Sequence, residues 1–236
     1  MKTWKWLFIL SVLFTLGNTI VDVQYWQNGL PFQDDGLSKI FRFGRTLIIA
    51  MMAGILYYHQ SHLKNVRLLL YAFLLTVVAD GFLILANLLQ IGMLFFIIVQ
   101  VLLILRHAPP LDQLKKNKLK VLYAFLTGTI LYTIIYTLID KNPIDLPIQD
   151  PILKYAFVLV VSLISAQLAE LRPEFTRSQS QKILWGMVFF FLCDLTVVLP
   201  LLFPENELAL LARALTGLLY TPALLLLVLS AKKENT

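Results

Sequence analysis

The sequence has little of what soluble enzymes and secreted domains depend on. Only 14% of its 236 residues are charged, it has three histidines, and Cys193 is its single cysteine. Soluble globular domains carry charge on about one residue in four. A single cysteine excludes an internal disulfide, so the redox compartment stays open.

The common catalytic and nucleotide-binding motifs are also missing from the sequence. It has no GxSxG nucleophile elbow, no Walker P-loop and no GxGxxG fingerprint. His59 and His62 are three residues apart, but no cysteine or further histidine stands near them, so no metal site is expected there. Cys193 is expected to pack as a small hydrophobe. The sequence therefore predicts no metal and no other cofactor.

The sequence does have long apolar segments. Hydrophobic residues make up 58% of the chain and the mean hydropathy is +0.76, a balance typical of membrane proteins. A membrane-spanning helix needs about 20 apolar residues. The pattern predicts one all-α domain over residues 1–236, a polytopic bundle of eight transmembrane helices. The expected spans are 4–24, 43–60, 67–89, 91–106, 119–139, 151–171, 182–202 and 208–231.

Three local features bear on these boundaries. The start, "MKTWKWLFILSVLFTLGNTI", is similar to a signal peptide but lacks a convincing cleavage site, so a retained first helix is expected. Residues 90–92 predict a tight hairpin before the fourth span. Pro143, Pro147 and Pro151 are expected to separate the fifth and sixth spans, because proline stops helices.

The distribution of basic residues predicts the orientation. With eight spans, 14 of the 20 Lys and Arg residues fall on the side that holds both termini, which the positive-inside rule places in the cytoplasm. The cluster "LKKNKLK" at residues 114–120 is expected to contact anionic lipid head groups, and no nucleic-acid partner is predicted. The predicted location is a bacterial inner membrane.

Two aspartates stand in the middle of apolar runs. Asp80 lies 13 residues after Arg67, and Asp194 lies 12 residues after Lys182. At 1.5 Å per residue both are roughly 18–20 Å from the cytoplasmic end of their helices, so they are expected at one depth. A charge there costs roughly 2.5–3.5 kcal/mol, which favours an interior position and a functional role. The other acids, Asp22 among them, are expected at or beyond helix ends.

Further polar residues are expected in the outer half of the bundle. Together with the two acids they predict a cavity with acids at its floor and cations at its mouth, which suits an amphiphile with an anionic head. The alternatives stay open: a purely structural aspartate pair, interfacial tyrosines and snorkelling cations. The candidate substrate-binding residues are Arg45, Gln100, Lys154, Tyr155, Arg213 and Tyr220.

At these residues the chain resembles the YhhN family, eight-helix membrane proteins whose characterised members are lysoplasmalogenases. The family's Gly-Asp pair corresponds to Ala79-Asp80, and its Asp after a small residue to Cys193-Asp194. Its Gly-x-x-x-Phe-x-x-x-His pattern corresponds to "GMLFFIIVQ", in which Gln100 replaces the histidine. Pro200 stands where an Asn is usual, and the Gln that usually follows the tyrosine matched by Tyr220 is not found. The resemblance covers roughly residues 39 to 230.

The resemblance implies hydrolysis of the vinyl ether bond of lysoplasmalogens, which releases a fatty aldehyde and a glycerophospho-head group. The expected partners are then a lysophospholipid substrate and membrane lipids. Asp80 and Asp194 are the expected catalytic acid and base. Removal from water favours the protonated form that donates, while the second, ionised carboxylate activates water. Which aspartate has which role stays open.

A non-enzyme is the alternative. Two intramembrane acids at one depth also fit a proton-coupled carrier or a lipid-binding protein. The third and seventh spans have similar patterns, which hints at a parallel repeat. No obviously broken helix is expected near the acids, since Gly81 and Pro200 are weak candidates for a break.

Overall fold

The computed structural model describes residues 2–27, 36–141, 146–203 and 207–232, and within these ranges it is helical without a strand. Two short segments, the π-helix η1 and the 3₁₀ helix η2, accompany nine α-helices in these ranges. In chain order the elements are α1 Lys2–Gln27, α2 Gly36–Gln60, α3 Lys64–Asp80, η1 Gly81–Leu85, α4 Leu89–His107, α5 Leu111–Lys116, α6 Lys118–Lys141, α7 Leu146–Gln167, η2 Ala169–Leu171, α8 Arg177–Leu202 and α9 Glu207–Leu229.

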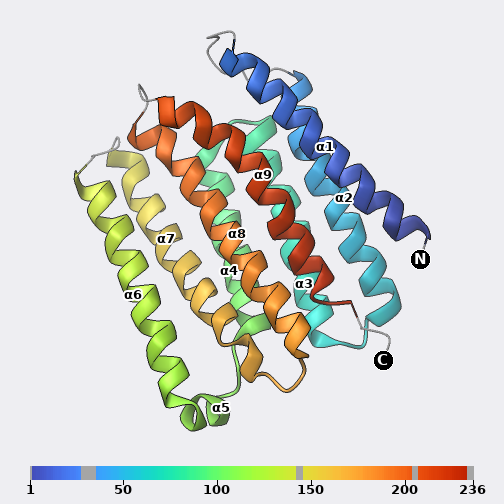
Figure 1. Ribbon diagram of the computed structural model, residues 1–236, viewed down its shortest axis with the longest axis vertical. Coiled ribbons are helices and arrows are strands. Elements are labelled where there is room, and N and C mark those ends of the chain that lie inside the picture. The colour runs from blue at the N-terminus through green and yellow to red at the C-terminus, as the bar shows by residue number, and fades with distance from the viewer. Residues whose placement is uncertain (1, 28–35, 142–145, 204–206, 233–236) are drawn as a thin grey trace.

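The long helices run side by side in a flattened bundle (Figure 1). Helices α1 and α2 form one edge, α6 and α7 form the other, and α3, α4, α8 and α9 lie between them. The beginning of α1 lies close to the segment that follows α9, since the Lys232 ammonium is 5.3 Å from the ring centre of Trp4. The cytoplasmic side of both termini and the bacterial origin stay predictions.

Seven helices of the described ranges are long and apolar enough to cross a membrane, and α9 contains a shorter apolar stretch, Ala214–Leu229. Apolar side chains cover much of the outside, and on α6 they include Leu122, Phe125 and Ile130. These features indicate an integral membrane protein. The count of eight spans stays a prediction.

Helices α2, α7 and α8 begin five or more residues earlier than predicted. Helix α2 begins at Gly36 instead of residue 43, because Ser38 and Arg42 bond to polar side chains of α1 and so extend the helix. Helix α7 begins at Leu146, and Pro147 and Pro151 lie inside it. Pro143 lies outside the described residues. The expectation that Pro147 and Pro151 end helices is wrong. Pro147 is in the first turn, where a proline lacks only an N–H that has no helical partner, and the helix continues through Pro151.

The hairpin before α4 is displaced from residues 90–92. Residues 86–88 make the turn, and Asn87 has a φ of 54°, a left-handed conformation that asparagine tolerates better than most residues. Gly92 lies inside α4, where it serves packing instead of a turn.

The third helix changes its hydrogen-bonding pattern immediately after Asp80. The α-helix α3 ends there and continues as η1. The two segments form one continuous span, Lys64–Leu85, so no broken helix lies at this acid, as expected, and Gly81 is the position at which the hydrogen-bonding pattern changes. Helix α8, by contrast, continues through Pro200 to Leu202. Short π segments inside α-helices are frequent at functional sites.

A buried arginine joins the helices at the end of the bundle that holds the chain ends. Arg106 of α4 donates hydrogen bonds to the carbonyl oxygen of Asn65 at 3.3 Å and to Ser230 Oγ at 2.8 Å, and contacts His107 Nε2 at 2.9 Å. The sequence alone identifies Arg106 only as one of the basic residues that predict the orientation in the membrane. In the structure it is fully buried and connects α3, α4 and the end of α9.

Candidate functional site

Asp80 lies in the interior of the bundle, with only 4% of its surface exposed. Thr46 of α2 and Tyr220 of α9 donate hydrogen bonds to its Oδ2 atom at 2.6 and 2.9 Å. The guanidinium of Arg45 lies 5.0 Å from the Tyr220 ring centre and within electrostatic range of the Asp80 carboxylate. Hydrogen bonds and a nearby cation offset the cost of keeping an ionised carboxylate out of water.

The backbone that carries Asp80 is held by a close approach of two helices. A Cβ atom at Gly92 would lie 2.4 Å from Cγ of Leu83 and 3.2 Å from the carbonyl oxygen of Ala79. The missing side chain allows α4 to lie directly against the junction of α3 and η1. The close approach of α4 at Gly92 therefore supports the backbone on both sides of Asp80.

Asp194 lies in α8 and is half-buried. The Tyr155 hydroxyl of α7 donates a hydrogen bond to its Oδ2 atom at 2.5 Å. The Asp80 and Asp194 carboxylates are within electrostatic range of each other, so the structure brings the two acids into one polar centre. The buried thiol of Cys193 lies in the same centre and donates to the carbonyl oxygen of Thr216 at 3.6 Å.

A chain of aromatic rings joins the two aspartate–tyrosine pairs. The Tyr155 ring is 6.3 Å from Phe96, Phe96 is 6.1 Å from Phe190, and Phe190 is 5.9 Å from Tyr220, all in edge-to-face arrangement. Such contacts stabilise by roughly 0.5–1.5 kcal/mol each beyond area burial. The rings form an apolar surface between the two polar pairs.

Two predicted substrate-binding residues have buried polar atoms without a partner. Gln100 of α4 is fully buried near the Tyr155 hydroxyl, but neither its Oε1 nor its Nε2 meets hydrogen-bond geometry with the described residues. Arg45 donates from Nη1 to the carbonyl oxygen of Gly217 at 3.1 Å, whereas its Nε has no partner there. Buried polar groups in folded proteins are nearly always satisfied, so these atoms indicate a place for water or a polar ligand.

Of the eight predicted catalytic and binding residues, the structure brings six together at the acids, and Lys154 is not among them. Its ammonium bonds to Asp150 at 2.6 Å on the surface of α7 and is 69% exposed. The backbone of Arg213 belongs to α9, and its side chain lies outside the described residues. The expected cavity itself stays a prediction. The residues that meet at the acids are Arg45, Asp80, Gln100, Tyr155, Asp194 and Tyr220.

Sequence reasoning missed Thr46 and the ring of Phe190, and misplaced Asp22. Thr46 follows Arg45 in an apolar helix, where a threonine hydroxyl usually bonds its own backbone, so its contact with Asp80 has no sequence signal. Asp22 was expected on the outer side at the end of the first span, but it is almost fully buried within α1. Its partners on α2 make that burial possible.

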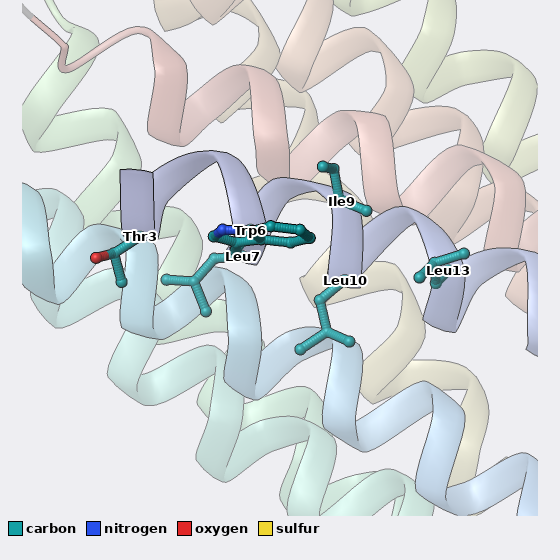
Figure 2. Close-up of a pocket in the computed structure, with 6 residues that line it drawn as sticks. All are labelled: Thr3, Trp6, Leu7, Ile9, Leu10 and Leu13. Atoms are coloured by element: carbon teal, nitrogen blue, oxygen red, sulfur yellow. The ribbon is translucent and has the colours of Figure 1, made fainter. Parts of the chain in front are cut away.

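An apolar hollow lies elsewhere, along α1 (Figure 2). Its volume is about 480 Å³, and it has no ionisable side chain, so it offers nothing for acid–base chemistry. Within the described ranges no group of three or more His, Cys, Asp or Glu residues is placed to hold a metal ion. The hollow is lined by Thr3, Trp6, Leu7, Ile9, Leu10 and Leu13.

Comparison with models of protein families identifies the family of the chain. The YhhN family model matches residues 40–231, so the chain belongs to the YhhN family, as the resemblance predicted. This family includes lysoplasmalogenases. The matched range contains every residue of the polar centre, and α1 precedes it. No similar protein of curated function and no similar solved structure was found.

Proposed function

We propose that this YhhN-family protein hydrolyses the vinyl ether bond of lysoplasmalogens by carboxylate acid–base catalysis within the bundle. The observation that carries the proposal is the meeting of two interior carboxylates, each hydrogen-bonded by a tyrosine, in one centre. Paired carboxylates in different surroundings divide into an acid and a base. The reaction needs one of each.

The surroundings support a division of roles. Asp80 accepts two hydrogen bonds and faces the Arg45 guanidinium, so it is the carboxylate better suited to carry a negative charge. Asp194 accepts one hydrogen bond, from Tyr155, and faces the charge of Asp80. A second negative charge beside the first is disfavoured. Asp194 is therefore the proton donor and Asp80 the ionised partner.

The chemistry then proceeds in three steps that conserve protons. Asp194 gives its proton to the β-carbon of the vinyl ether, which leaves an oxocarbenium ion stabilised by the Asp80 charge. Water adds to the α-carbon and passes a proton to Asp80, forming a hemiacetal. In the last step Asp80 returns this proton to the leaving alcohol oxygen while Asp194 takes the hydroxyl proton. The C–O bond breaks, the fatty aldehyde and the glycerophospho-alcohol leave, and both acids are reset.

Other groups of the centre have supporting roles. The unpaired amide of Gln100, beside Tyr155, is placed to hold the attacking water. The rings of Phe96 and Phe190 provide an apolar wall for the alkenyl chain between the acids. Arg45 lies within electrostatic range of Asp80 and is proposed to face the phosphate of the head group.

A proton-coupled carrier or lipid-binding protein is the second candidate, and one observation favours it. The π-helix η1 changes the helical hydrogen bonding directly after Asp80, and irregular helices beside an intramembrane acid are common in transporters. Aldehyde release from a lysoplasmalogen by the purified protein separates the two. The hydrolase releases aldehyde in proportion to enzyme, whereas a carrier releases none and moves lipid in a proton-dependent manner.

A further inference from the structure

The hydroxyl of Thr46 turns away from its own helix. A threonine inside a helix commonly donates to the carbonyl oxygen four residues earlier, as Thr76 of α3 does to Ala72 at 2.9 Å. From Thr46 Oγ1 the corresponding distance to the carbonyl oxygen of Arg42 is 3.4 Å, longer than the roughly 2.5–3.0 Å usual for a hydroxyl donor. The distance from Thr46 Oγ1 to Asp80 Oδ2 is 2.6 Å. A hydroxyl has one proton, so Thr46 donates it to Asp80.

Thr46 and Tyr220 together hold one oxygen of Asp80. Both hydrogen bonds that Asp80 accepts from the described residues end on Oδ2, at 2.6 Å from Thr46 and at 2.9 Å from Tyr220. The two donors come from α2 and α9, while α4 supports the backbone of Asp80 at Gly92. Two donors on one oxygen restrain the rotation of the carboxylate. The oxygen that they leave open for proton exchange is Oδ1.

Thr46 is the more rigid of these two donors. It is fully buried, and rotation about a single side-chain bond separates its backbone from its hydroxyl oxygen. The Tyr220 hydroxyl lies at the far end of a ring that two side-chain bonds connect to the backbone. The position of Oδ2, and with it the direction of Oδ1, therefore depends most directly on Thr46.

The charges around Asp80 come from other residues. Among the described residues, four other titratable groups lie within electrostatic range of Asp80: Arg45 on α2, Tyr220 on α9, and Cys193 and Asp194 on α8. Thr46 carries no charge and acts on Asp80 by a direct hydrogen bond. Its hydroxyl can therefore be removed without changing any charge of the polar centre.

We infer that Thr46 is the positioning residue of Asp80, which holds Oδ2 in place and leaves Oδ1 to exchange the proton with water. This inference rests on the proposed function, because it names the atom that performs two of its proton transfers. Oδ1 takes a proton from water as the hemiacetal forms, and it returns this proton to the leaving alcohol oxygen as the C–O bond breaks. The carboxylate ends as it began, and Thr46 acts only through Asp80.

Thr46→Val tests the inference, because valine resembles threonine in shape and lacks the hydroxyl. Aldehyde release from a lysoplasmalogen by the full chain in detergent is measured across pH. The ionised form of Asp80 loses a donor in this variant. The acid limb of kcat should therefore move to higher pH by about one unit or more, which lowers kcat about tenfold or more on that limb. KM should stay unchanged, since Thr46 acts through Asp80 and not on the lipid.

Thr76→Val is the matched control. Thr76 is a buried threonine one turn before Asp80 on α3, and its hydroxyl donates to its own backbone. This variant should change neither kcat nor the acid limb. Thr46→Ser keeps the hydroxyl and should restore both, whereas Thr46→Ala lacks it and should shift the limb as Thr46→Val does. A lower melting temperature with an unshifted limb in Thr46→Val and Thr46→Ala, or no restoration in Thr46→Ser, would overturn the inference.

Infrared titration of the Asp80 carboxyl group separates this inference from the proposed function, because it needs no turnover. The band is identified by its loss in Asp80→Asn. Its midpoint should move to higher pH in Thr46→Val and stay in place in Thr76→Val. Such a shift without aldehyde release by the parent would reject the hydrolase and retain Thr46 as the residue that orients Asp80. Aldehyde release with an unmoved midpoint and acid limb in Thr46→Val would reject the inference and retain the hydrolase.

Discussion

Replacing the two tyrosines separately by phenylalanine tests which aspartate carries the charge. Tyr220 donates to Asp80 and Tyr155 donates to Asp194. Phenylalanine removes only the hydroxyl, so the ring contacts with Phe190 and Phe96 remain. The two substitutions are therefore matched in packing and differ in the carboxyl group that loses a hydrogen bond.

The magnitudes follow from the charge of the acceptor. A hydrogen bond to a charged group contributes about 1.5–3 kcal/mol, and one between neutral groups about 0.5–1.5 kcal/mol. At about 1.4 kcal/mol per factor of ten, Tyr220→Phe should lower kcat by roughly 10- to 150-fold, because it depopulates the ionised form of Asp80. Tyr155→Phe should lower kcat by roughly 2- to 10-fold, since the protonated Asp194 loses a weaker bond.

The assay is aldehyde release from a lysoplasmalogen at saturating substrate, with thermal unfolding as the control for folding. A larger loss in Tyr155→Phe than in Tyr220→Phe would refute the assignment of Asp80 as the ionised partner and would exchange the two roles. Equal and small losses in both would show that neither hydrogen bond contributes to turnover.

Three further substitutions address stability. Gly92→Ala should lower the melting temperature, with an unfolding cost of roughly 1–3 kcal/mol from overpacking at the α3–η1 junction, whereas Gly54→Ala, where a Cβ meets nothing within 4 Å, should not. Ser230→Ala leaves a buried Arg106 donor unpaired and should cost about 1–3 kcal/mol in thermal unfolding, with kcat unchanged; an unaltered melting temperature would show that the bond is dispensable. Glu174 accepts hydrogen bonds from a neighbouring arginine that hold the pKa of its carboxyl below the usual value. The stabilisation is therefore present above the unfolded-state pKa and is lost as pH falls through the folded-state pKa. Glu174→Gln should have a lower melting temperature than the parent at pH 7, and this difference should disappear in acid. A difference in melting temperature that does not change with pH would contradict this.

The sequence predicts the two acids and the helical class because both signals are strong. An aspartate inside an apolar run is visible without any structure, and its cost in lipid indicates an interior position. Tyr155 and Tyr220 are predicted from the sequence as substrate-binding residues, and that role stays a prediction. Their contacts with the acids depend on how four helices pack, which periodicity does not determine.

The errors have equally specific causes. Lys154 and Tyr155 are adjacent, but neighbours on a helix point about 100° apart, so only one of them faces the interior. Asp22 was placed outside because an acid near a helix end is normally solvated, whereas here Arg42 and Asn18 satisfy it inside. Gly92 was assigned to a turn although its role is close packing, and the two uses of glycine look alike in a sequence.

Aldehyde release by the wild type, Asp80→Asn, Asp194→Asn and the double variant is the measurement that tests the central claim most directly. The wild type should release aldehyde from a lysoplasmalogen, and each single variant should lose activity by roughly 10²–10⁴-fold, because an amide cannot transfer the proton. The double variant should be no worse than the singles, since residues that act as a unit are non-additive. All variants should keep a melting temperature near that of the wild type. No aldehyde from the wild type, or near-normal release by either single variant, would contradict the account.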